Sequence, residues 1–117
     1  REAGAEAAGR LLTAAPQITA IVAANDLLAL GAYDALRERG LRCPEDISVV
    51  GHNDMPLMDL VAPALTSVRI EHRAMGREAY DLLVQWMRRA DAFLRMVMLT
   101  PRLVVRGSTA APRPELR

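Results

Sequence analysis

Two short apolar runs with a helical stretch between them constrain the fold of this chain more than any other feature. The runs cover residues 18–24 and 47–51, and each contains a single hydroxyl residue. Apolar runs of this length suit strands buried on both faces, as in parallel sheets. Residues 26–39 have apolar side chains at helical spacing and end before Gly40, and Gly31 indicates a close approach of this helix to the sheet. A strand, a helix and a strand in this order form a βαβ unit, so the sequence predicts an α/β fold around a parallel sheet.

Small polar residues follow both apolar runs: Asn25 and Asp26 after the first, and His52, Asn53 and Asp54 after the second. Parallel strands point the same way, so these residues are expected at the carboxyl edge of the sheet, where open α/β sheets bind ligands. Amide and carboxylate groups suit hydroxyl-rich ligands. Asn25 and Asn53 are predicted to face a small-molecule crevice, with loop bracing as the alternative. Asp26 is predicted mainly to cap the helix, whereas Asp54 is either a ligand contact or a turn residue.

The rest of the chain alternates between helical and strand-like patterns. The sequence predicts a helix over residues 2–15, a strand over 66–70, an amphipathic helix over 72–89, and β-like pieces over 96–99 and 103–106. Residues 110–117 are predicted to be a flexible tail. The chain begins at Arg1, without Met and already in a helical pattern, so we expect a fragment whose N-terminal part is missing.

The composition excludes several classes of function. A net charge of +1 argues against this chain gripping nucleic acid by itself. No apolar run approaches the roughly 18 residues that a membrane span needs, so no membrane association is expected. The single Cys43 rules out an internal disulfide and fits a reducing compartment. The histidines lack a ligand-like cluster, and neither a Gly-rich phosphate loop nor a nucleophile elbow is present, so no metal, cofactor or catalytic residue is expected.

A series of short motifs, taken together, resembles the C-terminal part of the effector-binding domain of LacI-family transcriptional regulators. The resemblance covers nearly all of residues 10–109, in the order and spacing of the family. The motifs that carry it are Ile18–Asp26, Leu30-Gly31, Arg39–Arg42, Pro44–Gly51, Pro63–Val68, Met75–Arg77 and Pro101–Thr109.

This resemblance implies a fold and a function. The fold would be a three-layer parallel-sheet sandwich of the periplasmic-binding-protein-like type I, a fragment with the C-terminal lobe, and residues 1–109 would form the C-terminal part of the effector-binding domain. The family's effector, a sugar or related polyol, sits in the cleft between two lobes and changes operator affinity through a helix-turn-helix domain. That domain and the first lobe are absent from this chain. The protein would be a cytoplasmic homodimer, and helix 72–89 would belong to the missing lobe.

The resemblance also implies roles for particular residues. Asn25 matches a position that contacts the effector, and Ile70 lies near the cleft in a hinge crossing over residues 66–71. Asn53 stands where many members have an effector-binding Asp, and His52 replaces the usual Phe or Tyr; both are departures. Together with Asp54, these positions make the predicted effector site Asn25, Asn53, Asp54 and Ile70. The residues predicted at the dimer interface are Leu27, Leu30, Met55 and Leu57.

Two rival functions are weaker. A periplasmic sugar-binding protein of a transport system has the same fold, but the runs 44–51 and 103–109 look more like those of regulators. An enzyme is disfavoured because no nucleophile–base pair is present. For the chain by itself, we expect the apolar face of helix 72–89 to be covered by another copy, or the helix to be displaced.

Overall fold

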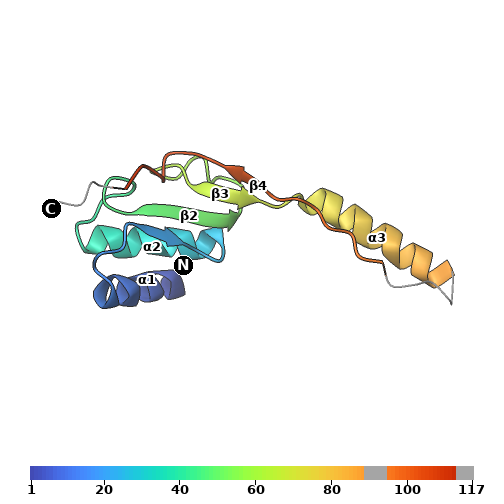
Figure 1. Ribbon diagram of the computed structural model, residues 1–117, viewed down its shortest axis with the longest axis horizontal. Helices are drawn as coiled ribbons and strands as arrows, with labels where there is room; N and C mark the ends of the chain where they lie inside the picture. Colours follow the sequence, from blue (N-terminus) through green and yellow to red (C-terminus); the bar gives the residue numbers. More distant parts are fainter. Residues whose placement is uncertain (89–94, 113–117) are drawn as a thin grey trace.

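The computed structural model describes residues 1–88 and 95–112 as an α/β body with one projecting helix (Figure 1). Its helices and strands follow the order predicted from the sequence; β1, β3 and β4 are shorter than predicted, whereas β2 extends to Asn53. They are α1 (Glu2–Ala14), β1 (Ala20–Val22), α2 (Asp26–Glu38), β2 (Ser48–Asn53), β3 (Thr66–Arg69), α3 (His72–Arg88) and β4 (Arg102–Val104).

The four strands form one sheet in the order β1-β2-β3-β4. The pairs β1–β2 and β2–β3 are parallel, and β4 joins antiparallel to β3. The register sets Val22 opposite Val50 and Asn53 opposite Arg69. The parallel βαβ unit and the mixed α/β class predicted from the sequence are therefore confirmed.

Strand β1 differs from its prediction. Only residues 20–22 join the ladder, and Val22 is 79% exposed while Ile21 is buried. The strand is at the edge of the sheet and one of its faces is open, so the prediction that this run is buried on both faces is wrong within this chain. Residues 96–99, predicted to be β-like, do not join the sheet either.

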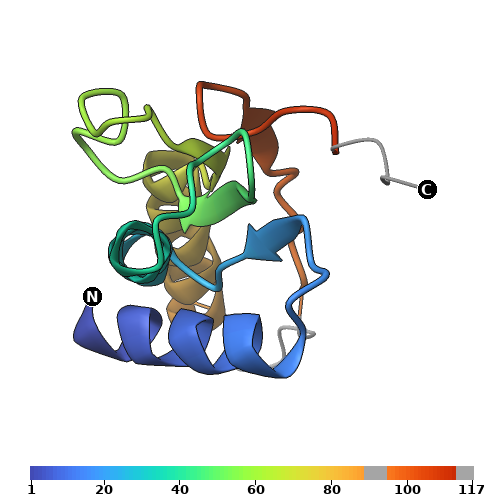
Figure 2. The same cartoon turned by 90° about the vertical axis from the view of Figure 1, so that its left-hand side faces the viewer.

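Helix α2 covers one face of the sheet and carries much of the core. Its buried face, which includes Leu36, packs with Val49 of β2 and with Leu65, and all three side chains are at most 1% exposed. Helix α1 packs mainly on α2, and Figure 2 shows α1 running across the view while α2 is seen nearly end-on. Glycines permit this close crossing, because a Cβ on Gly31 would meet the backbone of α1.

Helix α3 extends away from the end of the sheet (Figure 1). It has no buried residue, and large apolar side chains such as Tyr80 and Trp86 are more than 60% exposed. The helix is strongly amphipathic, and within residues 1–88 and 95–112 its apolar face stays largely exposed, although such a face is normally covered by a partner. Among the described helices, none is both long and apolar enough to cross a membrane.

Candidate functional site

The polar residues that follow β1 and β2 lie at one edge of the sheet, because the two strands are parallel neighbours. Asn25 directly precedes α2, and Asn53 is the last residue of β2. This is the carboxyl edge, where the sequence placed a ligand crevice.

Asn25, and not Asp26, is the N-cap of α2. Its backbone is extended (φ −158°, ψ 168°), and its Oδ1 accepts a hydrogen bond from the Leu28 backbone N–H at 2.9 Å. The prediction that Asp26 caps the helix is wrong. Since the oxygen of Asn25 is engaged, its amide NH₂ is the group left to meet a ligand. Among the described residues, none accepts a hydrogen bond from that NH₂.

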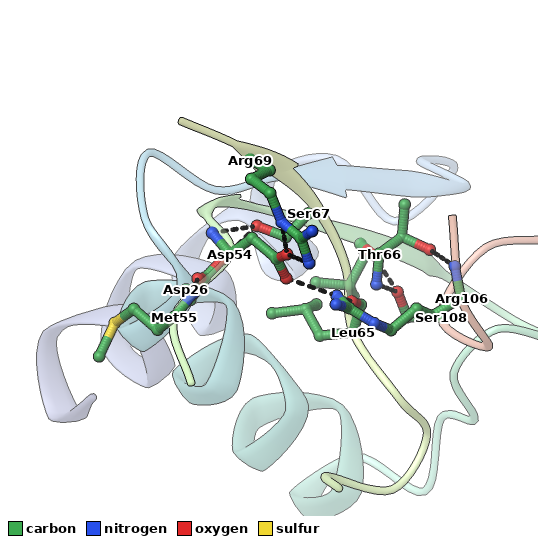
Figure 3. Close-up of polar contacts among 10 residues, drawn as sticks. Asp26, Asp54, Met55, Leu65, Thr66, Ser67, Arg69, Arg106 and Ser108 are labelled. Atoms are coloured by element: carbon green, nitrogen blue, oxygen red, sulfur yellow. Dashed lines mark hydrogen bonds and ion pairs between the residues drawn. The ribbon is translucent and has the colours of Figure 1, made fainter. Parts of the chain in front are cut away.

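Asp26 instead joins three segments beneath the edge. The residue is fully buried, and its carboxylate accepts hydrogen bonds from the Ser67 hydroxyl at 2.5 Å and from the Met55 backbone N–H at 2.6 Å (Figure 3). A Cβ on Gly51 would collide with the carboxylate, so the glycine of β2 makes room for it. The first turn of α2 is thereby tied to β3 and to the loop after β2.

Asp54 lies beside Asp26 and holds two arginines. Its carboxylate, 1% exposed, accepts hydrogen bonds from Arg69 Nε at 2.6 Å and from Arg106 Nη1 at 2.7 Å. Burial raises the pKa of the Asp54 carboxyl, but the hydrogen bonds from Arg106 and Arg69 outweigh burial and hold that pKa below its usual range. The effector contact at Asp54 stays a prediction, and its carboxylate is committed to the two arginines.

Asn53 and Asp54 adopt left-handed backbone conformations. Their φ angles are 103° and 53°. Such angles are uncommon for residues other than glycine, although Asn and Asp tolerate them best. The Asp54 N–H donates to the Ser67 hydroxyl at 3.1 Å, so the turn that presents Asn53 is anchored from below.

Ile70 and His52 are half-buried and line a cavity of about 320 Å³ between the end of the sheet, α3 and residues 97–101. The cavity also contains Glu71 and Glu78, so it is not wholly apolar. Of the predicted effector residues, only Ile70 lines this cavity.

The four residues predicted at the dimer interface fall into two groups. Leu27 and Leu57 are 47% and 64% exposed. Leu30 and Met55 are partly buried and pack against the core of this chain. Exposed apolar side chains at Leu27 and Leu57 leave room for a partner, and Leu30 and Met55 contribute in part to the fold.

Two residues of the C-terminal segment, Arg106 and Ser108, also bind the strands at the site. Residue patterns alone did not predict these contacts. Ser108 is fully buried; its hydroxyl donates to the Val49 carbonyl at 2.6 Å and accepts from the Thr66 N–H at 2.8 Å. Arg106 also donates to the Leu65 carbonyl at 2.6 Å. The only sequence signal was the polar run 106–109 after an apolar strand, which marks a turn as readily as a buried bridge.

The described residues contain no group of three or more His, Cys, Asp or Glu side chains that could hold a metal ion. Cys43 is half-buried, and burial is the main cause that raises the pKa of its thiol to about 11. The thiol is therefore protonated at neutral pH and donates to the Ser108 carbonyl at 3.5 Å.

From the ion pairs of Asp54 we expect the chain to lose stability at acidic pH. Because its folded pKa is lowered, its ion pairs stabilise the chain fully above the ordinary carboxyl pKa of about 3.9, and this stability disappears as pH falls through the folded value. The urea midpoint of the unchanged chain should fall below about pH 4 more steeply than that of Asp54→Asn. The exposed Asp81→Asn on α3 serves as the control and should keep the original profile. Parallel profiles for Asp54→Asn and the unchanged chain would contradict the assignment.

Comparison with known proteins identifies relatives over almost the whole chain. The family model of the periplasmic binding protein-like domain matches residues 1–109. The HTH-type transcriptional repressor PurR of Haemophilus influenzae is 37% identical over 92% of this chain, which spans 33% of that repressor. A lactose operon repressor sequence of Rhizobium radiobacter is 39% identical over 95% of this chain and 97% of its own length.

Solved structures agree. A LacI-family transcriptional regulator from Arthrobacter in complex with lactose superposes with a TM-score of 0.81 at 38% identity, over 93% of this chain and 42% of that one. The complex of the regulator CelR with cellobiose has a TM-score of 0.85 at 38% identity, over 90% and 32%. A dimeric Lac repressor has a TM-score of 0.85 at 35% identity, over 96% and 41%. The chain therefore belongs to the periplasmic binding protein-like domain family, as a member of its LacI-type transcriptional regulators.

Proposed function

We propose that this chain is the C-terminal part of the effector-binding domain of a transcriptional regulator that senses a sugar or related polyol. The observation that carries the proposal is the position of Asn25 and Asn53 at the carboxyl ends of two neighbouring parallel strands. The amide NH₂ of Asn25 and the side chain of Asn53 offer donors and an acceptor to hydroxyl groups. Similar regulators have been solved with lactose and cellobiose, which is consistent with such a ligand.

In this proposal, effector binding changes operator affinity by favouring one arrangement of two lobes over another. The largely exposed apolar face of α3 supports a second lobe, because a helix this amphipathic is stable only when that face is covered. Residues 72–88 would pack in that lobe, and the connections on either side of α3 would be the crossings between lobes. Operator DNA would be bound by a helix-turn-helix domain encoded elsewhere in the reading frame.

Ligand binding should depend on Asn53. The experiment is calorimetric titration of the full-length protein with lactose, cellobiose and ribose, the sugars bound in solved structures of similar regulators. For the ligand that binds, Asn53→Ala should weaken affinity by roughly 10- to 100-fold, since it removes one or two hydrogen bonds of about 1–1.5 kcal/mol each. The exposed Gln17→Ala is the control and should leave affinity unchanged. Equal affinities for the two variants would remove Asn53 from the site.

The exposed leucines favour a homodimer in the same region. Leu27 lies in the first turn of α2 and Leu57 in the loop after β2, and both are exposed. Leu27→Glu should shift the full-length protein toward monomer in sedimentation velocity at micromolar concentration, because the charge would be desolvated at the contact. The equally apolar Leu11→Glu on α1 should not. A dimer that survives Leu27→Glu would move the interface elsewhere.

A further inference from the structure

One residue, Asp54, binds both segments that connect the sheet with α3. Strand β3 ends at Arg69, and α3 begins at His72, so Arg69 lies where the chain leaves the sheet. The chain returns through β4, whose first residue, Arg102, pairs with Arg69. Arg106 follows on the same returning segment. Asp54 accepts hydrogen bonds from both Arg69 and Arg106.

Asp54 is also next in sequence to Asn53, which is predicted to contact the effector. Asn53 directly precedes Asp54, and Asn53 itself pairs with Arg69 in the β2–β3 register. Its φ of 103° places its backbone in a region that persists only when surrounding contacts enforce it. Those contacts fall on the next two residues: Asp54 binds the arginines and Ser67, and the Met55 N–H binds Asp26 (Figure 3).

The charge and burial of the Asp54 carboxylate make it difficult to replace with another side chain. Arg106 is 16% exposed and Arg69 is 38% exposed, whereas the carboxylate between them is 1% exposed. Loss of the carboxylate would remove the ion pairs of both guanidinium groups and leave Arg106, the more buried of the two, without its hydrogen-bonded counter-charge. Both segments would then be free to move relative to the turn that presents Asn53.

We propose that Asp54 is a positioning residue that sets the conformation of Asn53 and couples it to both segments connecting the sheet with α3. Movement of either segment changes the position of Asn53, because the arginine on that segment binds Asp54. Occupancy of Asn53 by a ligand would likewise restrain both segments together. The second statement rests on the proposed function, whereas the first concerns this chain alone.

The coupling is tested first without any ligand, by hydrogen–deuterium exchange on this chain. Asp54→Asn keeps the shape of the side chain but turns an NH₂ toward one of the arginines. We expect amide exchange to rise at least about tenfold in three places at once: residues 53–55, 69–71 and 102–106. Exchange within α1 and α2 should stay unchanged. The matched control is Asp34→Asn, which breaks the surface ion pairs of Asp34 with Arg1 and Arg37 on α2.

A uniform rise in exchange over the whole chain would make Asp54 merely structural, and a rise confined to residues 53–55 would show that the segments are not coupled. Either result would overturn the proposal. Single variants add a second check, since Arg69→Gln should loosen the 53–55 turn and so should Arg106→Gln. No change of exchange at the turn in either variant would also contradict the coupling.

The ligand-dependent part uses the full-length protein and the sugar identified by calorimetry. At saturating sugar, Asp54→Asn should lose most of the fold-change in operator affinity that the sugar produces, while Asp34→Asn retains it. An unaltered fold-change in Asp54→Asn would overturn the role of Asp54 in coupling. If the unchanged protein shows no sugar or operator response, the proposed function fails, and the exchange experiment still decides whether Asp54 couples Asn53 to the two segments.

Discussion

Replacing Asp26 with alanine is expected to lower the free energy of unfolding by about 3 kcal/mol, because a buried hydroxyl and a partly buried backbone N–H lose their acceptor. The carboxylate, fully buried, accepts from the Ser67 hydroxyl and from the Met55 N–H. An unsatisfied buried donor costs about 1–3 kcal/mol. Asp26→Asn should fall between alanine and the native residue, since its oxygen can serve one donor while its NH₂ faces the other.

The size of this loss in stability distinguishes two roles for Asp26: a buried side chain that joins three segments, and a helix cap. Urea unfolding of this chain provides the measurement, with two control variants. Asn25→Ala removes the actual cap and should cost about 1 kcal/mol. Asp59→Ala removes an exposed carboxylate from the loop after β2 and should stay within about 0.5 kcal/mol of the native chain. If Asp26→Ala costs no more than Asn25→Ala, Asp26 does not bridge the segments as described.

Gly31→Ala is expected to destabilise the chain by about 2 kcal/mol although alanine is the better helix former. An added Cβ would meet the Arg1 carbonyl, the Ala5 N at 2.6 Å and the Gly4 carbonyl carbon at 2.8 Å. These are backbone atoms of α1, so no side chain can rotate away and the two helices must separate. Overpacking of this kind costs about 3 kcal/mol, and the gain in helix propensity offsets about 1 kcal/mol.

Gly76→Ala is the matched control, because a Cβ at that helical position would meet nothing within 4 Å. It should be neutral or slightly stabilising in the same urea titration, since only the propensity gain remains. Near-ultraviolet circular dichroism of Tyr33, which is buried in α2, reports whether Gly31→Ala loosens the packing around that helix. Equal stabilities for the two alanine variants would show that α1 does not pack closely on Gly31.

Prediction from the sequence succeeded where a local pattern has one physical solution. The periodicity of residues 26–39 and the stop at Gly40 agree with α2, and the βαβ order required parallel strands whose polar ends share an edge. Short strands were harder, because their limits depend on which neighbours pair. Residues 96–99 look like a strand, but they do not join the sheet.

The roles of Asn25 and Asp26 show where local reasoning reached its limit. Both are good N-cap residues, and the choice between them depends on what surrounds the Asp26 carboxylate. Ser67 and Met55 lie 41 and 29 residues away in sequence, and they bury Asp26 in the fold. Gly31 was expected to approach the sheet, but it meets α1, because the face of α2 that a glycine occupies depends on which element packs there.

The sequence by itself determined the α/β class, the family, and the edge of the sheet at which Asn25 and Asn53 lie, since these follow from hydrophobic period, chain order and motif. Only the tertiary structure decided what the neighbouring carboxylates do. Asp54 holds Arg69 and Arg106 from 15 and 52 residues away, and Asp26 is buried against β3. Such pairings depend on three-dimensional distance and on the exclusion of water, and neither is encoded in the spacing of residues along the chain.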